Sequence, residues 1–92
     1  MIEPNLDILY ILEKLEREYS DVTKEDIINY FSEVFFKADG GLTVEQNNLY
    51  NRGIQKLITE GKIKMVTMGG YCYLTKLGQQ VIDNSRKHEI IT

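Results

Sequence analysis

Hydrophobic residues recur at helical spacing over four segments of the chain, and they alternate with other residues over a stretch between the third segment and the fourth. Apolar side chains three and four residues apart predict amphipathic helices, which we expect over 5–19, 24–37, 44–60 and 76–87. Between 62 and 74 two short apolar runs flank Gly69-Gly70, and adjacent glycines supply the positive φ angles of a type I′ turn. The pattern predicts an α+β, mostly helical domain with three helices, a two-stranded β-hairpin and a C-terminal helix.

The residues at the segment boundaries agree with these helices. Ser, Thr, Asn and Asp favour helix starts because their side chains accept hydrogen bonds from the first free amides. We expect caps at Asn5, Thr23, Thr43 and Thr75, with capping boxes where Asp26 and Gln46 follow three residues later. Glycine favours helix ends because it adopts the left-handed conformation, and we expect such ends at Gly40-Gly41 and Gly61.

The inward side of each element follows from its apolar stripe. We expect the core to contain Ile8, Ile11, Leu12, Leu15 and Tyr19 of the first helix, Ile27, Ile28, Phe31, Val34 and Phe35 of the second, Tyr50, Ile54, Leu57 and Ile58 of the third, Ile63, Cys72 and Leu74 of the hairpin, and Leu77, Val81 and Ile82 of the fourth helix. Further apolar residues lie off the first stripe or in the C-terminal tail (84–92), whose residues 88–92 are expected to fray: Leu6, Leu9, Tyr10, Ile90 and Ile91. Apolar side chains beyond one face indicate burial on two sides or contact with a second chain, and we expect a homodimer formed through these five residues.

Charge is distributed unevenly along the 92 residues, whose net charge is −3. Residues 1–45 carry 4 basic and 11 acidic side chains, and residues 46–92 carry 7 basic and 3 acidic ones. Phosphate groups are neutralised by Lys and Arg, so a polyanion is expected on the second half, whereas the acidic first half favours a protein partner. No apolar run approaches the ~20 residues of a membrane span, and the acidic start lacks the basic region of a signal peptide. We therefore expect a cytoplasmic protein of one domain (1–92) with no membrane partner.

Two stretches carry a resemblance to a known family. "LITEGKI" (57–63) followed by "YCYLTKLGQQVI" (71–82) resembles the end of a recognition helix, a wing and the Leu-Thr-x-x-Gly opening of the next helix in small winged helix-turn-helix regulators, including those related to the MarR and PadR families. The resemblance covers 23–83 and implies a winged-helix core there, preceded by an N-terminal helix (1–22). The hairpin departs from the usual pattern because its tip carries no Arg or Lys.

The helix over 44–60 holds the candidate base-reading residues. A projection at 100° per residue with Tyr50 inward places Asn48, Arg52 and Gln55 in one line on the opposite side, with Asn51 and Lys56 on its flanks. Arg pairs with guanine, and Asn or Gln with adenine, so the line predicts readout of double-stranded DNA in the major groove. The alternative interpretation of these residues is an ordinary solvated helix face.

The hairpin holds the candidate phosphate contacts. Lys62 and Lys64 border it, and Tyr71 and Tyr73 share the outward side of its second strand. These side chains could position the DNA backbone. Alternatively, the lysines protect an edge strand and the tyrosines pack on the opposing strand.

The residue types give no indication of an enzyme active site. The single His88 lies near the tail, where a His-based triad would require the tail to fold back. One Cys and one His cannot supply a structural zinc site, so no cofactor or metal is expected. The leading hypothesis is a sequence-specific, homodimeric DNA-binding transcriptional regulator. The alternative is an acidic winged-helix interaction module, encoded by a phage or mobile element, that binds a host protein.

Overall fold

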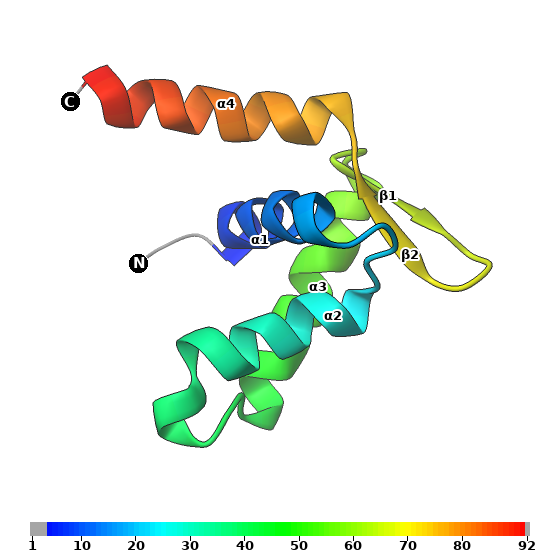
Figure 1. Ribbon diagram of the computed structural model, residues 1–92, viewed down its shortest axis with the longest axis vertical. Helices are drawn as coiled ribbons and strands as arrows, with labels where there is room; N and C mark the ends of the chain where they lie inside the picture. Colours follow the sequence, from blue (N-terminus) through cyan, green and yellow to red (C-terminus); the bar gives the residue numbers. More distant parts are fainter. Residues whose placement is uncertain (1–3, 92) are drawn as a thin grey trace.

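The computed structural model describes residues 4–91, with side chains for 5–87. In this part of the chain the elements follow in the order α1 (Pro4–Glu18), α2 (Lys24–Tyr30), a π-helical turn (Phe31–Phe35), a 3₁₀ turn (Lys37–Asp39), α3 (Val44–Thr59), β1 (Ile63–Val66), β2 (Tyr71–Leu74) and α4 (Lys76–Ile91). Helix α1 lies between α4 and α2, α3 packs across α1 and α2, and the hairpin projects from one end (Figure 1). The fold is α+β and mostly helical, as predicted.

Helix α1 forms the centre of the core, because neighbouring elements cover it on two sides. Ile8, Leu9 and Leu12 are fully buried and meet buried residues of α2, α3, the hairpin and α4. The burial of Leu9 corrects one expectation: this residue belongs to the chain's own core and is not free for a dimer interface. Tyr10 is half-buried, and its hydroxyl donates to Ser85 Oγ of α4 at 2.8 Å.

The packing of α4 therefore accounts for Leu9 and Tyr10, which lie off the main stripe. Of the other residues proposed for a dimer, Leu6 is half-buried, whereas the side chains of Ile90 and Ile91 lie outside the described residues. The backbone of α4 is helical through Ile91, so the fraying expected after residue 87 is not observed up to that residue.

A buried carboxylate joins α1 to α4. Glu13 is 9% exposed, and Arg86 donates to both of its oxygens, with the Nη1–Oε2 bond at 3.1 Å. Gln79 Nε2 donates to Oε2 at 2.8 Å, and Arg17 lies 3.5 Å from Oε1. Chiefly because of the Arg86 hydrogen bond, the pKa of the Glu13 carboxyl lies below its ordinary value. The cluster fixes α4 on α1 through paired charge as well as through apolar contact.

The second helix differs from the sequence-based prediction at its C-terminal end. The Phe36 N–H donates to the Phe31 carbonyl at 3.2 Å, five residues back, so the helix widens into a π-helical turn. The extra residue in this turn rotates the segment that comes after it. As a result, Phe36 packs edge-on against Tyr50 with ring centroids 6.3 Å apart, while Val34 and Phe35 are 53% and 59% exposed. The expectation that Val34 and Phe35 face the core was wrong.

The expectations that Tyr19 and Leu77 lie in the core and that Asn5 caps the first helix were also wrong. Tyr19 is 60% exposed because α1 ends at Glu18 and the chain turns away. Leu77 is 45% exposed, since the neighbouring Gly78 makes the close contact with the hairpin. Helix α1 begins at Pro4, so Asn5 lies inside its first turn, and proline is favoured at such a start.

The starts of α2, α3 and α4 and the end of α3 agree with the prediction, whereas α4 continues to Ile91, beyond the predicted residue 87. Capping boxes join Thr23 with Asp26 and Thr43 with Gln46, and Thr75 Oγ1 accepts from the Gly78 N–H at 3.1 Å. Gly61, at φ +77°, follows the end of α3.

The hairpin keeps the predicted faces but not the predicted turn length. Gly69 and Gly70 have φ angles of +89° and +68°, as predicted. The register pairs Val66 with Tyr71, so the loop holds residues 67–70 and not the two glycines alone. A two-residue shift in pairing preserves the alternation of side chains, and Cys72 remains buried, as expected. The free edge of β2 is partly covered, because the Cys72 N–H donates to the Val22 carbonyl at 2.7 Å.

Candidate nucleic-acid interface

Helix α3 is held so that one side faces the core and the opposite side faces solvent. Tyr50, Ile54 and Leu57 are buried, and the Tyr50 ring stacks on Phe31 at a centroid distance of 4.2 Å and an interplanar angle of 19°. The buried stripe fixes the rotation of the helix about its axis. The line formed by Asn48, Arg52 and Gln55 is accordingly exposed, as the projection predicted.

The start of α3 is well ordered by its own hydrogen bonds. The Thr43 N–H donates to Gln46 Oε1 at 2.9 Å, and the Gln46 N–H donates to Thr43 Oγ1 at 3.1 Å. The loop before it is tied to the preceding turn because the Leu42 N–H donates to Ser32 Oγ at 3.3 Å. A fixed N-terminal half is what a base-reading helix requires, since that half lies nearest the bases.

Asn51 and Lys56, which flank the line, differ in whether their side chains are hydrogen-bonded within the protein. Asn51 is half-buried, and its Nδ2 donates to the Asn47 side chain at 2.7 Å and to the Asn47 carbonyl at 3.0 Å. Lys56 is exposed and borders a hollow between α3, the start of α1 and α4. Asn51 therefore supports the helix surface, whereas the charge of Lys56 lies near the start of α1 and near α4.

The hairpin places two of its predicted contacts beside acidic partners. Lys62 Nζ lies 3.1 Å from Glu60 Oε1, and the Tyr73 hydroxyl donates to Asp21 Oδ1 at 3.3 Å. Partial desolvation and then the Asp21 charge raise the pKa of the Tyr73 hydroxyl, which stays protonated near neutral pH. Both side chains are already engaged within the protein, so they are weaker candidates for phosphate contact than their positions indicated.

Lys64 and Tyr71 complete the outward side of the hairpin. Lys64 pairs across the strands with Tyr73, and Tyr71 pairs with Val66. This register places the two tyrosines opposite Lys64 and Val66, which is compatible with the cross-strand interpretation of the tyrosines. Lys64 is exposed and remains the lysine of the hairpin best placed for a phosphate.

Sequence reasoning missed several exposed apolar residues near these groups. Val44 and Leu49 of α3 are 78% and 42% exposed, and Met68 at the hairpin tip is 85% exposed. Leu49 lines a shallow hollow of about 430 Å³ on the outer side of α3 together with Glu45, Gln46, Asn48 and Arg52. The projection that placed Tyr50 inward also puts the adjacent Leu49 off the core side, so the signal was present in the spacing.

Comparison with known proteins gave no match: no family model, no curated protein and no solved structure matches the chain. Within the described residues, no group of three or more His, Cys, Asp and Glu side chains is arranged to hold a metal ion. No helix in the part of the chain covered by the structure is long and apolar enough to cross a bilayer. The arrangement on α3 is one of hydrogen-bonding side chains on an exposed and anchored helix.

Proposed function

We propose that the protein is a sequence-specific DNA-binding transcriptional regulator of the winged helix-turn-helix type. The observation that carries the proposal is the exposed line formed by Asn48, Arg52 and Gln55 on a helix anchored along its opposite side. The order of three helices, a hairpin and a further helix supports the winged-helix assignment.

In this proposal α3 lies in the major groove with its capped end toward the bases. Arg52 donates to the O6 and N7 atoms of a guanine, and Asn48 and Gln55 pair with adenines. Lys56 and Lys64 contact phosphates and set the position of the protein on the duplex. Because Lys62 and Tyr73 are engaged by Glu60 and Asp21, they contribute less than the free lysines.

We also propose that the protein binds DNA as a homodimer. Leu6, which is half-buried, and the end of α4, which continues to Ile91, remain the candidate contacts after the correction at Leu9. Two-fold symmetry would place two copies of α3 on neighbouring half-sites of a palindromic sequence.

The first test is selection of a binding site from random duplexes, followed by fluorescence-anisotropy titrations at several salt concentrations. Arg52→Ala should weaken binding to the selected site by about 1 to 3 kcal/mol and relax the preference at one base pair, since a bidentate base contact is lost. Lys64→Ala should weaken binding to every sequence alike and make the salt dependence shallower, because a phosphate contact releases counterions without reading bases.

The two variants serve as controls for each other because both residues are exposed and neither change should alter folding much. General unfolding could not produce one sequence-dependent and one sequence-independent loss. If selection enriches no sequence and the protein binds duplex DNA no better than an unrelated acidic protein, the proposal is wrong.

A further inference from the structure

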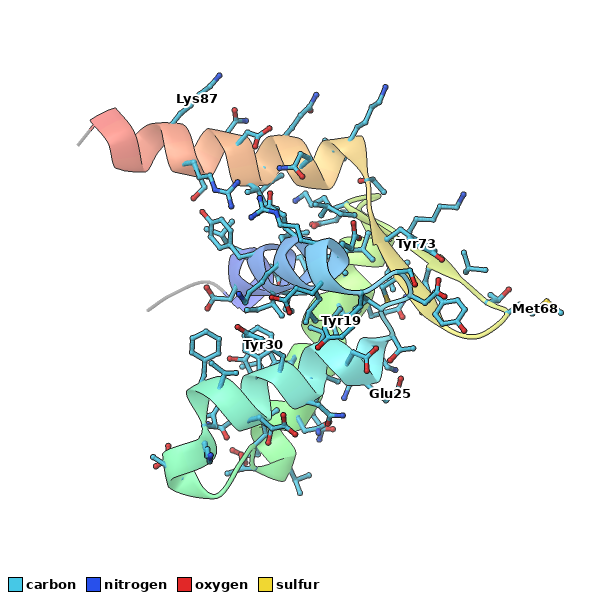
Figure 2. The ribbon with its side chains drawn as sticks, viewed as in Figure 1. Tyr19, Glu25, Tyr30, Met68, Tyr73 and Lys87 are labelled. Atoms are coloured by element: carbon cyan, nitrogen blue, oxygen red, sulfur yellow. The ribbon has the colours of Figure 1, made fainter. Side chains whose placement is uncertain are left out.

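A groove separates the end of α1 from α2, on a part of the surface that the DNA proposal does not use. It is lined by Leu15, Tyr19, Asp21, Val22, Asp26, Asn29, Tyr30 and Glu33 and has a volume of about 340 Å³. Tyr19 and Tyr30 lie between the two helices (Figure 2). That volume is at the lower end of ligand pockets, and the groove is therefore suited to a few side chains of a larger partner.

The groove is built from one stripe on each helix. Asp26, Asn29 and Tyr30 of α2 and Glu33 of the π-helical turn follow the spacing of one helix face, beside the buried Ile27 and Phe31. The other wall is made by the end of α1 and the segment that follows it, where Tyr19 turns outward. Both walls are anchored in the core, so the groove exists without rearrangement of the helices.

Exposed aromatic surface continues along the groove. Tyr19 is 60% exposed, and Phe35, which the π-helical turn moves out of the core, is 59% exposed. The Phe35 ring lies 6.2 Å from that of Tyr30 in an edge-on arrangement. Exposed aromatic residues gathered in one place are typical of interaction surfaces, because they bury large areas at low entropic cost.

The charges around the groove are of one sign. Its lining residues include the carboxylates of Asp21, Asp26 and Glu33 and no basic side chain. Asp26 is committed in part to the capping box through Oδ2, and Asp21 accepts the Tyr73 hydroxyl, while Glu33 is exposed. A duplex is repelled from such a surface, whereas Lys and Arg side chains are attracted both to the carboxylates and to the faces of the tyrosine rings.

We propose that this groove binds a basic, amphipathic segment of a partner protein. Apolar side chains of that segment enter between Leu15, Tyr19 and Tyr30, and its Lys or Arg residues lie over the tyrosines and beside Glu33 and Asp21. The proposal is independent of DNA binding, since none of the groove residues belongs to the line on α3 or to the lysines proposed for phosphate.

The test uses a short fluorescein-labelled peptide with Leu and Lys at helical spacing, titrated with the full chain and followed by anisotropy. A scrambled peptide of the same composition and a counterpart with Glu in place of Lys are the peptide controls. The wild-type protein should bind the patterned peptide at least about tenfold more tightly than either control. Tyr19→Ala and Glu33→Lys should each weaken that binding about tenfold, the loss expected at a central contact.

Matched variants away from the groove separate local contact from general charge. Glu45→Lys makes the same charge change at the start of α3, and Met68→Ser removes an exposed apolar side chain at the hairpin tip; both should leave peptide binding within about twofold of wild type. Equal losses in Glu33→Lys and Glu45→Lys, or equal binding of the scrambled peptide, would overturn the proposal.

Two further measurements complete the test. Sedimentation of Tyr19→Ala should match wild type; loss of self-association in this variant would show instead that a second copy of the chain fills the groove. Tyr19→Ala should also retain binding to the selected duplex, so failure of the DNA proposal and failure of the groove proposal give different results.

Discussion

The contact between α4 and the hairpin rests on Gly78, where any side chain would meet a backbone atom. A Cβ built on Gly78 would overlap the carbonyl oxygen of Lys62 and lie 2.8 Å from Leu74 Cδ1. The Lys62 carbonyl is not free to move, because it accepts the Thr75 N–H at 3.2 Å. Gly78→Ala should therefore separate α4 from the base of the hairpin or break that hydrogen bond.

Two opposing contributions determine how much Gly78→Ala changes the free energy of unfolding. Overpacking of a close contact costs roughly 1 to 3 kcal/mol, and an obstacle in the backbone places Gly78→Ala near the upper value. Alanine is better than glycine in a helix by at most about 1 kcal/mol. The net loss should be about 2 kcal/mol of unfolding free energy, which for a domain of this size lowers the melting temperature by roughly 8 to 16 °C.

Gly53→Ala in α3 is the matched control for Gly78→Ala, since both substitutions replace a helical glycine and gain the same helix propensity. Its Cβ would meet Ile8 Cδ1 at 2.8 Å and Asn5 Oδ1 at 2.9 Å, which are side-chain ends and not backbone atoms. Urea and thermal unfolding followed by circular dichroism should show a change below about 1 kcal/mol for Gly53→Ala. If Gly78→Ala is as stable as wild type, the described approach of α4 to the hairpin is incorrect.

Two other predictions concern the buried carboxylate and the hairpin loop. Arg86 lowers the pKa of the Glu13 carboxyl in the folded protein below its ordinary value of 4.5. The ionised carboxylate therefore stabilises the fold above that pH, and this stabilisation is lost as the pH falls through the pKa of the folded protein. In urea titrations Glu13→Gln should cost about 1 to 3 kcal/mol at pH 7 and progressively less in acid, whereas Glu18→Gln, at an exposed ion pair, should cost less than about 1 kcal/mol at pH 7. Gly69→Val should lower the melting temperature more than Gly70→Val, since a Cβ at Gly69 lies 2.7 Å from the Tyr71 ring and one at Gly70 meets nothing within 4 Å; the reverse order would contradict the loop geometry.

Features decided by neighbouring residues could be predicted from the sequence. The capping boxes at Thr23 and Thr43 depend on side chains three residues apart, and the inward stripe of α3 depends on one helical period. The positive φ angles at Gly69 and Gly70 follow from a residue type that tolerates them. For the same reason the exposed line on α3 was predictable, since it lies opposite that stripe.

Features decided by distant packing could not be predicted in this way. An uninterrupted helix over 24–37 would face Phe35 inward, but the π-helical turn brings Phe36 against Tyr50 instead, and Tyr50 lies on another helix. The hairpin register leaves residues 67–70 in the loop, and the Cys72 N–H of β2 donates to the Val22 carbonyl, which lies outside the hairpin. Likewise, the paired charges of Glu13 and Arg86 are 73 residues apart, and no local pattern indicates their contact.

The groove between α1 and α2 shows why net charge is a poor guide to partners for this chain. One wall follows a spacing that can be read from the sequence, through Asp26, Asn29, Tyr30 and Glu33, whereas the place of Tyr19 in the other wall depends on α1 ending at Glu18. A total charge of −3 argues against a duplex when averaged over the surface, but a partner meets one surface at a time. Under the two proposals the acidic groove and the α3 line of Asn48, Arg52 and Gln55 bind oppositely charged partners, and the acidity that weakens the case for DNA overall strengthens the case for a basic protein segment at the groove.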